Sequence, residues 1–272
     1  KYDLLNYFML IPPEERNKVK YVSFDMWETY RIITKHVFPS AICITDHFHV
    51  IQELNRRVDR VRIRVQNRFR KTINTLKPKE NNKTITPEEI VELEEASRYY
   101  YVLKKFNWLL ASTNKKILDV NVERRFNHRL NRYLNYSEIL AYMLAIDDEL
   151  EEAFYLRNDV TYFYDHCTYD TAKKQLEKII IDFRSSTVAE MSPFANTLTN
   201  WKREIINSFI IVDDKANRKM NTAIVENRNK SIKLLKHASN GYLNWERFRN
   251  RILYTLNEDT TFYYTSIRKD GK

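Results

Sequence analysis

Two aspartates near the start of the chain each follow a short apolar segment. Asp25 follows the segment 20–24, and Asp46 follows the segment 41–45. Aspartate carboxylates offer the hard oxygen ligands that divalent cations such as Mg²⁺ bind in proteins. The pair therefore predicts a cation site, provided that the fold brings the ends of these two segments together.

The residues between the two aspartates predict how they are positioned. Each apolar segment is typical of a strand, and Met26 to Phe38 is typical of one helix that Pro39 ends. Strands joined by a helical crossover lie parallel, and the crossover is almost always right-handed. Both aspartates are then expected at the carboxyl ends of adjacent strands, the edge where open α/β sheets bind ligands.

These two strands predict a larger sheet than the chain itself offers. The residues around Val22 and Ile42 are apolar on both faces, as in central strands of a covered sheet. A sheet of two strands is marginal and leaves its edges unpaired. The rest of the chain shows no suitable partner strand, and its first residue is Lys1 rather than Met. We therefore expect further strands to come from a preceding part of a longer protein.

Composition favours a helical protein with a polyanionic partner. The 272 residues include 46 Lys and Arg against 36 Asp and Glu, a net charge of +10. This excess favours nucleic acid over a membrane surface, although an ordinary basic protein would show it too. Only two glycines occur, so turns are few and helix should dominate. No apolar run is long enough to span a membrane, and the cytoplasm is the expected compartment.

The two cysteines and the scattered histidines exclude several site classes. Cys43 and Cys167 allow neither a zinc-finger spacing nor a disulfide framework. His128 and His166 have no partner at ligand spacing and are interpreted as structural or surface residues. The acidic run 147–152 is interpreted as a solvated helix face rather than a metal site.

The middle of the chain predicts helices only. A long helix is expected from His49 to about Leu76, with one apolar face and basic residues on the others. The polar segment Lys77–Thr86 is expected to be a loop. Aromatic residues beyond it are interpreted as core rather than as a base-stacking platform. The expected helices span residues 87–111, 114–133, 136–166, 169–187 and 193–210.

The last segment predicts two more helices that could contribute charged side chains. In the first, Glu226, Asn229, Lys230 and Lys233 share one face because residues three and four apart are neighbours. Gly241 is expected to cap that helix and Asn244 to start the next one. The second helix contributes Arg249 and Arg251. Each cation could hold a phosphate or simply belong to a solvated face.

Several motifs resemble the ISL-three family of bacterial insertion-sequence transposases, and the resemblance extends from about Leu4 to Leu256. Five motifs in the same order make the resemblance specific, because any one of them alone would be weak. They are Val22-Ser-Phe-Asp25-Met-Trp-x-x-Tyr30, with Phe38-Pro39-x-Ala41; Asp46-x-Phe48-His49-Val50; Trp201-x-x-Glu204-Ile205-x-Asn207-Ser208-Phe209; Glu226-x-x-Asn229-x-x-Ile232-Lys233; and Gly241-Tyr242-x-Asn244 with Phe248-Arg249-x-Arg251.

The resemblance implies a partial ribonuclease-H-like α/β core, lacking its first three strands, with a large all-α insertion. It implies domains at 1–76 (the partial core), 77–210 (the insertion) and 211–272 (core helices with the third acid). It further implies a DDE-type site in which Asp25 is the second acid and Glu226 the third, with the first acid upstream of Lys1. Two Mg²⁺ or Mn²⁺ ions would then bind the acids and the scissile phosphate.

Other residues receive supporting roles from the same resemblance. Asp46 and His49 resemble an Asp-x-x-His motif of the related Mutator-like elements. They are expected to form a hydrogen-bonded pair that shapes the site or contacts DNA, with simple helix capping as the alternative. Asn229 is expected to shape the site as well. The residues expected to bind DNA phosphates are Lys230, Lys233, Arg249 and Arg251.

Three functions are compatible with these expectations. The first is a transposase fragment for DNA strand cleavage and strand transfer, inactive alone because it lacks the first acid. The second is a DNA-binding remnant that no longer cuts. The third is a helical scaffold that binds proteins. The resemblance implies double-stranded DNA as partner, a homo-oligomer on that DNA, and a bacterial cytoplasmic, nucleoid-associated location.

Overall fold

The fold is described from a computed structural model, which covers residues 2–213, 218–219, 223–239 and 241–256. The chain forms two compact units, Lys1–Met220 and Asn221–Lys272, and each is described by itself. The described part of the first unit contains most of the helices and all of the strands, and the second contains two helices. A mostly helical fold, as expected from the sequence, is confirmed.

The N-terminal segment forms the predicted strand–helix–strand unit. Strands β1 and β2 are parallel and pair residue for residue, from Tyr21 with Ile42 to Phe24 with Thr45. No other strand in the described residues joins this sheet. The bounds of the elements are α1 (Tyr2–Met9), α2 (Pro13–Arg16), β1 (Tyr21–Phe24), α3 (Glu28–Val37) and β2 (Ile42–Thr45).

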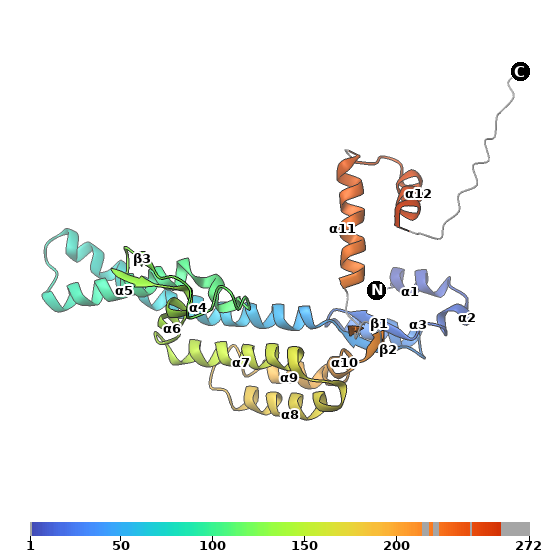
Figure 1. The fold of residues 1–272 in the computed structure, drawn as a ribbon, viewed down its shortest axis with the longest axis horizontal. Coiled ribbons are helices and arrows are strands. Elements are labelled where there is room, and N and C mark those ends of the chain that lie inside the picture. Colours follow the sequence, from blue (N-terminus) through green and yellow to red (C-terminus); the bar gives the residue numbers. More distant parts are fainter. Residues whose placement is uncertain (1, 214–217, 220–222, 240, 257–272) are drawn as a thin grey trace, which may run out of the picture. The chain divides into compact units, whose positions relative to one another are not determined.

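Helix α4 (His47–Asn81) is longer than predicted and continues through Pro78. The expected loop at Lys77–Thr86 is therefore wrong for its first half. Pro78 lacks the N–H that would bond to the Asn74 carbonyl, and the helix continues for only one turn beyond that missing bond. Helix α5 (Pro87–Lys105) packs back along α4 and buries Leu76, which stabilises the extension. Figure 1 shows these two helices as a long hairpin.

A β-hairpin replaces the helix that was predicted over 114–133. After α5 the chain forms a short 3₁₀ helix, η1 (Asn107–Ala111), and then an irregular segment. Strands β3 (Arg125–Asn127) and β4 (Arg132–Leu134) follow and pair in antiparallel register. The Asn127 side chain accepts hydrogen bonds from the backbone N–H of Arg129 and Leu130, and Asn131 has φ +51°. Such local side-chain bonds favour a turn over a helix.

Five helices complete the first unit. The predicted helix 136–166 is broken, because the Asp147 side chain caps a new helix by accepting from Leu150 N–H at 3.1 Å. The predicted helix 193–210 is likewise split at Trp201. A short antiparallel pair, β5 (Ile211–Asp213) with β6 (Arg218–Lys219), was not expected. The helices are α6 (Tyr136–Leu144), α7 (Asp148–His166), α8 (Tyr169–Ser185), α9 (Phe194–Asn200) and α10 (Lys202–Asn207).

One hydrophobic core runs through the first unit. It begins at Phe24 on β1, follows the apolar face of α4 and ends at Phe209. A smaller cluster under α1 and α3 contains Ile33, Val37 and Phe38. Helix α4 itself continues past residue 76, to Asn81. The three-domain division stays a prediction.

The second unit consists of α11 (Ala223–Ala238) and α12 (Trp245–Leu256). Gly241 has φ +95° and donates its N–H to Lys236 O at 3.0 Å, so the predicted cap is confirmed. The Asn244 side chain accepts from Arg247 N–H, as expected for a helix start. The apolar pattern of the second helix predicts Trp245 on its inward face, but Trp245 is 68% exposed. The sequence also predicts Asn221 or Thr222 as the cap of the first helix, and both lie outside the described residues.

Candidate acidic site at the end of the β1–β2 sheet

The structure confirms that the two aspartates follow neighbouring strand ends. Phe24 pairs with Thr45, so Asp25 and Asp46 follow the last residue pair of the sheet. Asp25 is half exposed, whereas Asp46 is buried, with 3% exposure. The two carboxylates therefore differ in what they can bind. Asp25 is accessible to an external ligand, whereas Asp46 is accessible only to groups of the protein itself.

Asp46 caps helix α4. Its Oδ1 accepts a hydrogen bond from Phe48 N–H at 3.0 Å and lies 3.3 Å from His47 Nδ1. A side-chain oxygen at this position satisfies a backbone N–H that the helix leaves unpaired. This geometry supports helix capping, the alternative role of Asp46, and places the His47 imidazole beside its carboxylate. The Asp46–His49 pair stays a prediction.

His49 pairs with Asp25. Its Nε2 lies 2.7 Å from Asp25 Oδ1, and His49 is in the first turn of α4. The cap at Asp46 fixes where that first turn begins and so fixes the imidazole. The exposed Asp25 carboxylate, which follows β1, is therefore held in place by a less exposed histidine from the helix that follows β2. Sequence reasoning selected both residues but not the contact between them.

The remaining predicted site residues lie in the second unit. Glu226 is in α11, but its side chain lies outside the described residues. Further along α11, Asn229, Lys230 and Lys233 are exposed. In α12, Arg249 and Arg251 are exposed as well. Cationic side chains must be exposed to bind phosphates, so these four residues meet that requirement. That Glu226 and Asp25 form one site stays a prediction.

The described donor set fits part of a divalent-cation site. Asp25 presents an exposed carboxylate, the ligand type that Mg²⁺ and Mn²⁺ prefer, beside an imidazole that holds it. Among the described residues no three His, Cys, Asp or Glu side chains come close enough to hold an ion. Asp25 can therefore supply one ligand, and a complete site needs further ligands.

A buried ion pair supports the sheet from the side of the insertion. Arg31 on α3 lies 3.1 Å from Glu204 on α10, with side-chain exposures of 10% and 5%. The Arg31 guanidinium also lies over the Trp201 ring at 3.6 Å, and it donates to Asn200 O at 2.9 Å. These contacts fix the end of the insertion against the strand–helix–strand unit. Sequence reasoning noted Glu204 and Trp201 in a motif but missed Arg31.

Asn207 makes a second connection of this kind. Its side-chain Nδ2 donates to Cys43 O on β2 at 2.9 Å, and α10 packs against β2. The motif that begins at Trp201 therefore has a structural role. It returns the chain from the insertion to the sheet, and so it positions the strand ends that carry the candidate site.

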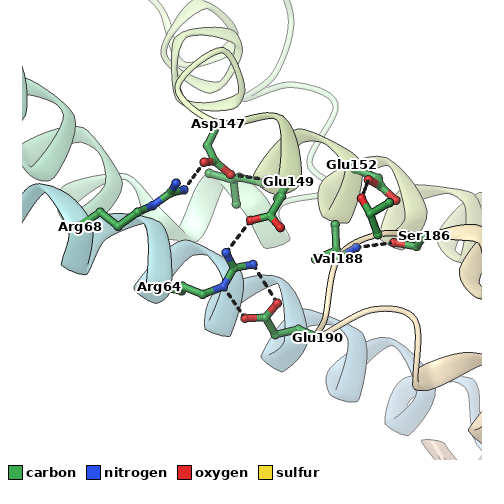
Figure 2. Close-up of polar contacts among 10 residues, drawn as sticks. Arg64, Arg68, Asp147, Glu149, Glu152, Ser186, Val188 and Glu190 are labelled. Carbon is green, nitrogen blue, oxygen red and sulfur yellow. Dashed lines mark hydrogen bonds and ion pairs between the residues drawn. The ribbon is translucent and has the colours of Figure 1, made fainter.

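Much of the positive charge of α4 is paired with acidic side chains of the same protein. Figure 2 shows Arg64 between Glu149 and Glu190, and Arg68 paired with Asp147. The acidic run 147–152 therefore pairs in part with α4 and is not simply a solvated face. The basic residues that remain exposed on α4 without an ion pair among the described residues are Arg60, Arg70 and Lys71.

The Arg64–Glu190 contact predicts a loss of stability in acid. Arg64 donates to both Glu190 oxygens at 2.8 and 2.9 Å, which holds the pKa of Glu190 below its usual range. A carboxylate with a lowered folded-state pKa stabilises the fold above its unfolded pKa, and this contribution is lost as the pH falls through the folded value. We expect Glu190→Gln to cost about 1–2 kcal/mol at neutral pH, a value discounted for partial solvent screening, and almost nothing in acid.

Urea unfolding at neutral and at acidic pH measures this difference. The exposed Glu92→Gln variant is the matched control, and its stability should follow wild type at both pH values. An equal destabilisation of Glu190→Gln at both pH values would contradict the assignment, because it would not depend on ionisation.

A family model described as "Transposase", for the ISL3 family, matches residues 1–252, which is most of the chain. The chain belongs to the ISL3 transposase family. The resemblance drawn from the sequence motifs is thereby confirmed. No solved structure matches this chain.

A curated relative of this ISL3-family chain is the transposase for insertion sequence element IS1001 of Bordetella parapertussis. The two sequences are 24% identical over 243 residues, covering 89% of this chain and 48% of the relative. The chain thus spans about half the length of that relative. In the described residues, no helix is both long and apolar enough to cross a bilayer.

Proposed function

We propose that this chain forms the C-terminal part of a DNA transposase that cleaves and transfers DNA strands with a divalent metal. The observation that carries the proposal is Asp25: an exposed carboxylate at a strand end, held by His49 at 2.7 Å, in a chain of the ISL3 family. In the proposal, Asp25 and Glu226 are two of three acids in a ribonuclease-H-like core. The first acid and the missing strands would come from an upstream part of a longer protein, so the chain alone is inactive.

Each residue of the described site has a defined task in this proposal. Asp25 contributes a carboxylate oxygen as ligand. His49 restricts the rotation of that carboxylate, and Asp46 fixes His49 by capping α4. Bound Mg²⁺ or Mn²⁺ would supply the activation of the attacking oxygen and the stabilisation of the leaving oxygen. Asn229, beside Glu226 on α11, would support the third acid.

Half-buried strands support the idea that the sheet continues. Tyr21, Val22 and Ser23 of β1 are only half-buried, and Ile42 of β2 is 40% exposed. Apolar strand residues with this exposure are expected where further elements cover a sheet. The proposal assigns that cover to the upstream part of a longer protein.

Double-stranded DNA is the proposed partner. The exposed cations of α11 and α12, and those that remain unpaired on α4, offer positive charge for a polyanion. Assembly as a homo-oligomer on DNA and a nucleoid location in the bacterial cytoplasm belong to the same proposal and stay predictions.

The salt dependence of DNA binding tests the proposed phosphate contacts. We expect replacement of Lys230, Lys233, Arg249 and Arg251 by glutamine to flatten the slope of log K against log salt concentration. The expected change is about 0.9 for each lost contact with duplex DNA. Fluorescence anisotropy titrations over a range of salt concentrations give the slope.

The control for this test removes equally many cations that the structure already pairs with acids. Those residues are Lys18, Lys77, Lys79 and Lys202. Their replacement by glutamine should leave the slope nearly unchanged. Equal flattening in both variants would mean that net charge, rather than the α11 and α12 contacts, governs binding.

A further inference from the structure

The hairpin β3–β4 exposes a set of aromatic rings that the core does not use. Phe126 and Tyr133 face each other across the strands, with ring centroids 5.0 Å apart. They are 40% and 67% exposed. His128 lies against Phe126 at 4.9 Å and is exposed as well. Adjacent exposed rings of this kind are costly to leave in water and indicate a binding surface.

The same hairpin is strongly basic. From Arg124 to Leu134 it contains four arginines and no aspartate or glutamate. Arg124 forms an ion pair with Glu138, whereas Arg125, Arg129 and Arg132 are exposed and form none among the described residues. Aromatic rings between exposed arginines match the chemistry of unpaired nucleic acid, in which flat bases alternate with phosphates.

The hairpin is also held rigidly at its base. Leu130 is buried, and Leu134 packs against the core from the opposite side of the ribbon. Asn135 donates to Val120 O and Val122 O at 3.0 and 3.3 Å, and Arg124 binds Glu138 through two nitrogens. A platform that is already ordered loses little conformational entropy when a ligand binds.

We infer that the β3–β4 hairpin binds an unpaired DNA segment, with bases stacked on Phe126 and Tyr133 and phosphates held by the neighbouring arginines. This inference rests on the proposed function for the choice of DNA, and it adds a site separate from Asp25. Charge argues against a second copy of the chain as occupant, since two hairpins with unpaired arginines and no acids repel each other.

Two DNA probes test the inference with the complete 272-residue chain. One is a short blunt duplex, and the other is the same duplex with an unpaired thymine overhang. We expect the Phe126→Ala/Tyr133→Ala variant to bind the overhang probe roughly tenfold or more weakly, because each stacked base contributes about 1–3 kcal/mol. Its affinity for the blunt duplex should stay within about twofold of wild type. Fluorescence anisotropy without divalent metal gives both constants.

Two matched variants separate stacking from other effects. Tyr133→Phe keeps the ring and should bind the overhang like wild type. Tyr155→Ala removes a tyrosine on α7 that is 54% exposed, and it should change neither constant. Circular dichroism should show an unchanged fold for all variants, since the buried hairpin residues are retained.

The inference is overturned by several results. One is that the double alanine variant binds the overhang probe as tightly as wild type, or loses equal affinity for both probes. Another is that wild type binds neither probe. The last is a molar mass of the wild-type protein that shows the rings join two copies of the chain. Binding is measured without metal, so the test does not require the protein to transfer DNA strands. Selective stacking in a protein that never transfers strands would sustain this inference and refute only the proposed function.

Discussion

Replacement of Asp25 by alanine is expected to lower DNA strand transfer by a factor on the order of 10³ or more. A metal ligand of this kind supports several kcal/mol of transition-state stabilisation, and each 1.36 kcal/mol corresponds to a tenfold change in rate. The assay uses the full-length protein with a transposon-end substrate and Mg²⁺, and it counts joined products. Binding of the same DNA should change little, because Asp25 is an acid and not a phosphate contact.

Two further variants show whether the effect belongs to the site. His49→Gln should lower activity by about 10- to 100-fold, the range for a residue that orients a ligand. Asp3→Ala, an exposed aspartate on α1, should leave activity unchanged. Wild-type activity in Asp25→Ala would refute the site assignment. A wild-type protein that binds DNA yet transfers no strand would favour the DNA-binding remnant.

Loss of one partner of the Arg31–Glu204 pair is expected to have the largest effect on stability. Both side chains are nearly buried, so removing Arg31 leaves the Glu204 carboxylate without this ion pair in a poorly solvated place. The typical cost is about 3–5 kcal/mol, a large part of the stability of a domain. We expect this loss for Arg31→Met, and a smaller one for Glu204→Leu, because Arg31 keeps its 3.1 Å ion pair with the half-exposed Glu28. Urea unfolding followed by circular dichroism measures it.

The double variant gives the sharper test. Arg31→Met/Glu204→Leu removes both charges and should be less destabilised than Arg31→Met alone, because no unpaired buried carboxylate remains. Glu15→Gln provides the surface comparison: it breaks an exposed ion pair with Lys18 and should cost under about 1 kcal/mol. Additive losses in the double variant would contradict a charge-based role for the pair.

The same pair links stability to the candidate site. It joins α3 to α10, and Asn207 on α10 binds the backbone of β2. Loosening α10 should therefore disturb the strand end that precedes Asp46. Single variants that still fold at low temperature are expected to lose activity before they lose DNA binding, and parallel titrations of both properties measure the order of loss.

The sequence alone determined the features that depend on local pattern. Two short apolar segments, one on each side of a helical segment, were enough to predict β1, α3 and β2. They also predicted that Asp25 and Asp46 lie at adjacent strand ends. The capping box at Thr86 and the glycine cap at Gly241 follow from short-range hydrogen bonds and backbone freedom. The family also followed from the sequence, since its motifs are short and occur in a fixed order.

Tertiary structure decided which of the neighbouring side chains meet. His47 and His49 are two residues apart, and only the cap of α4 directs the second toward Asp25 and the first toward Asp46. Arg31 and Glu204 are 173 positions apart, so no local pattern joins them. The hairpin at Phe126 and Tyr133 replaced a predicted helix because Asn127 satisfies the turn. Contacts between distant residues depend on packing, which sequence periodicity does not encode.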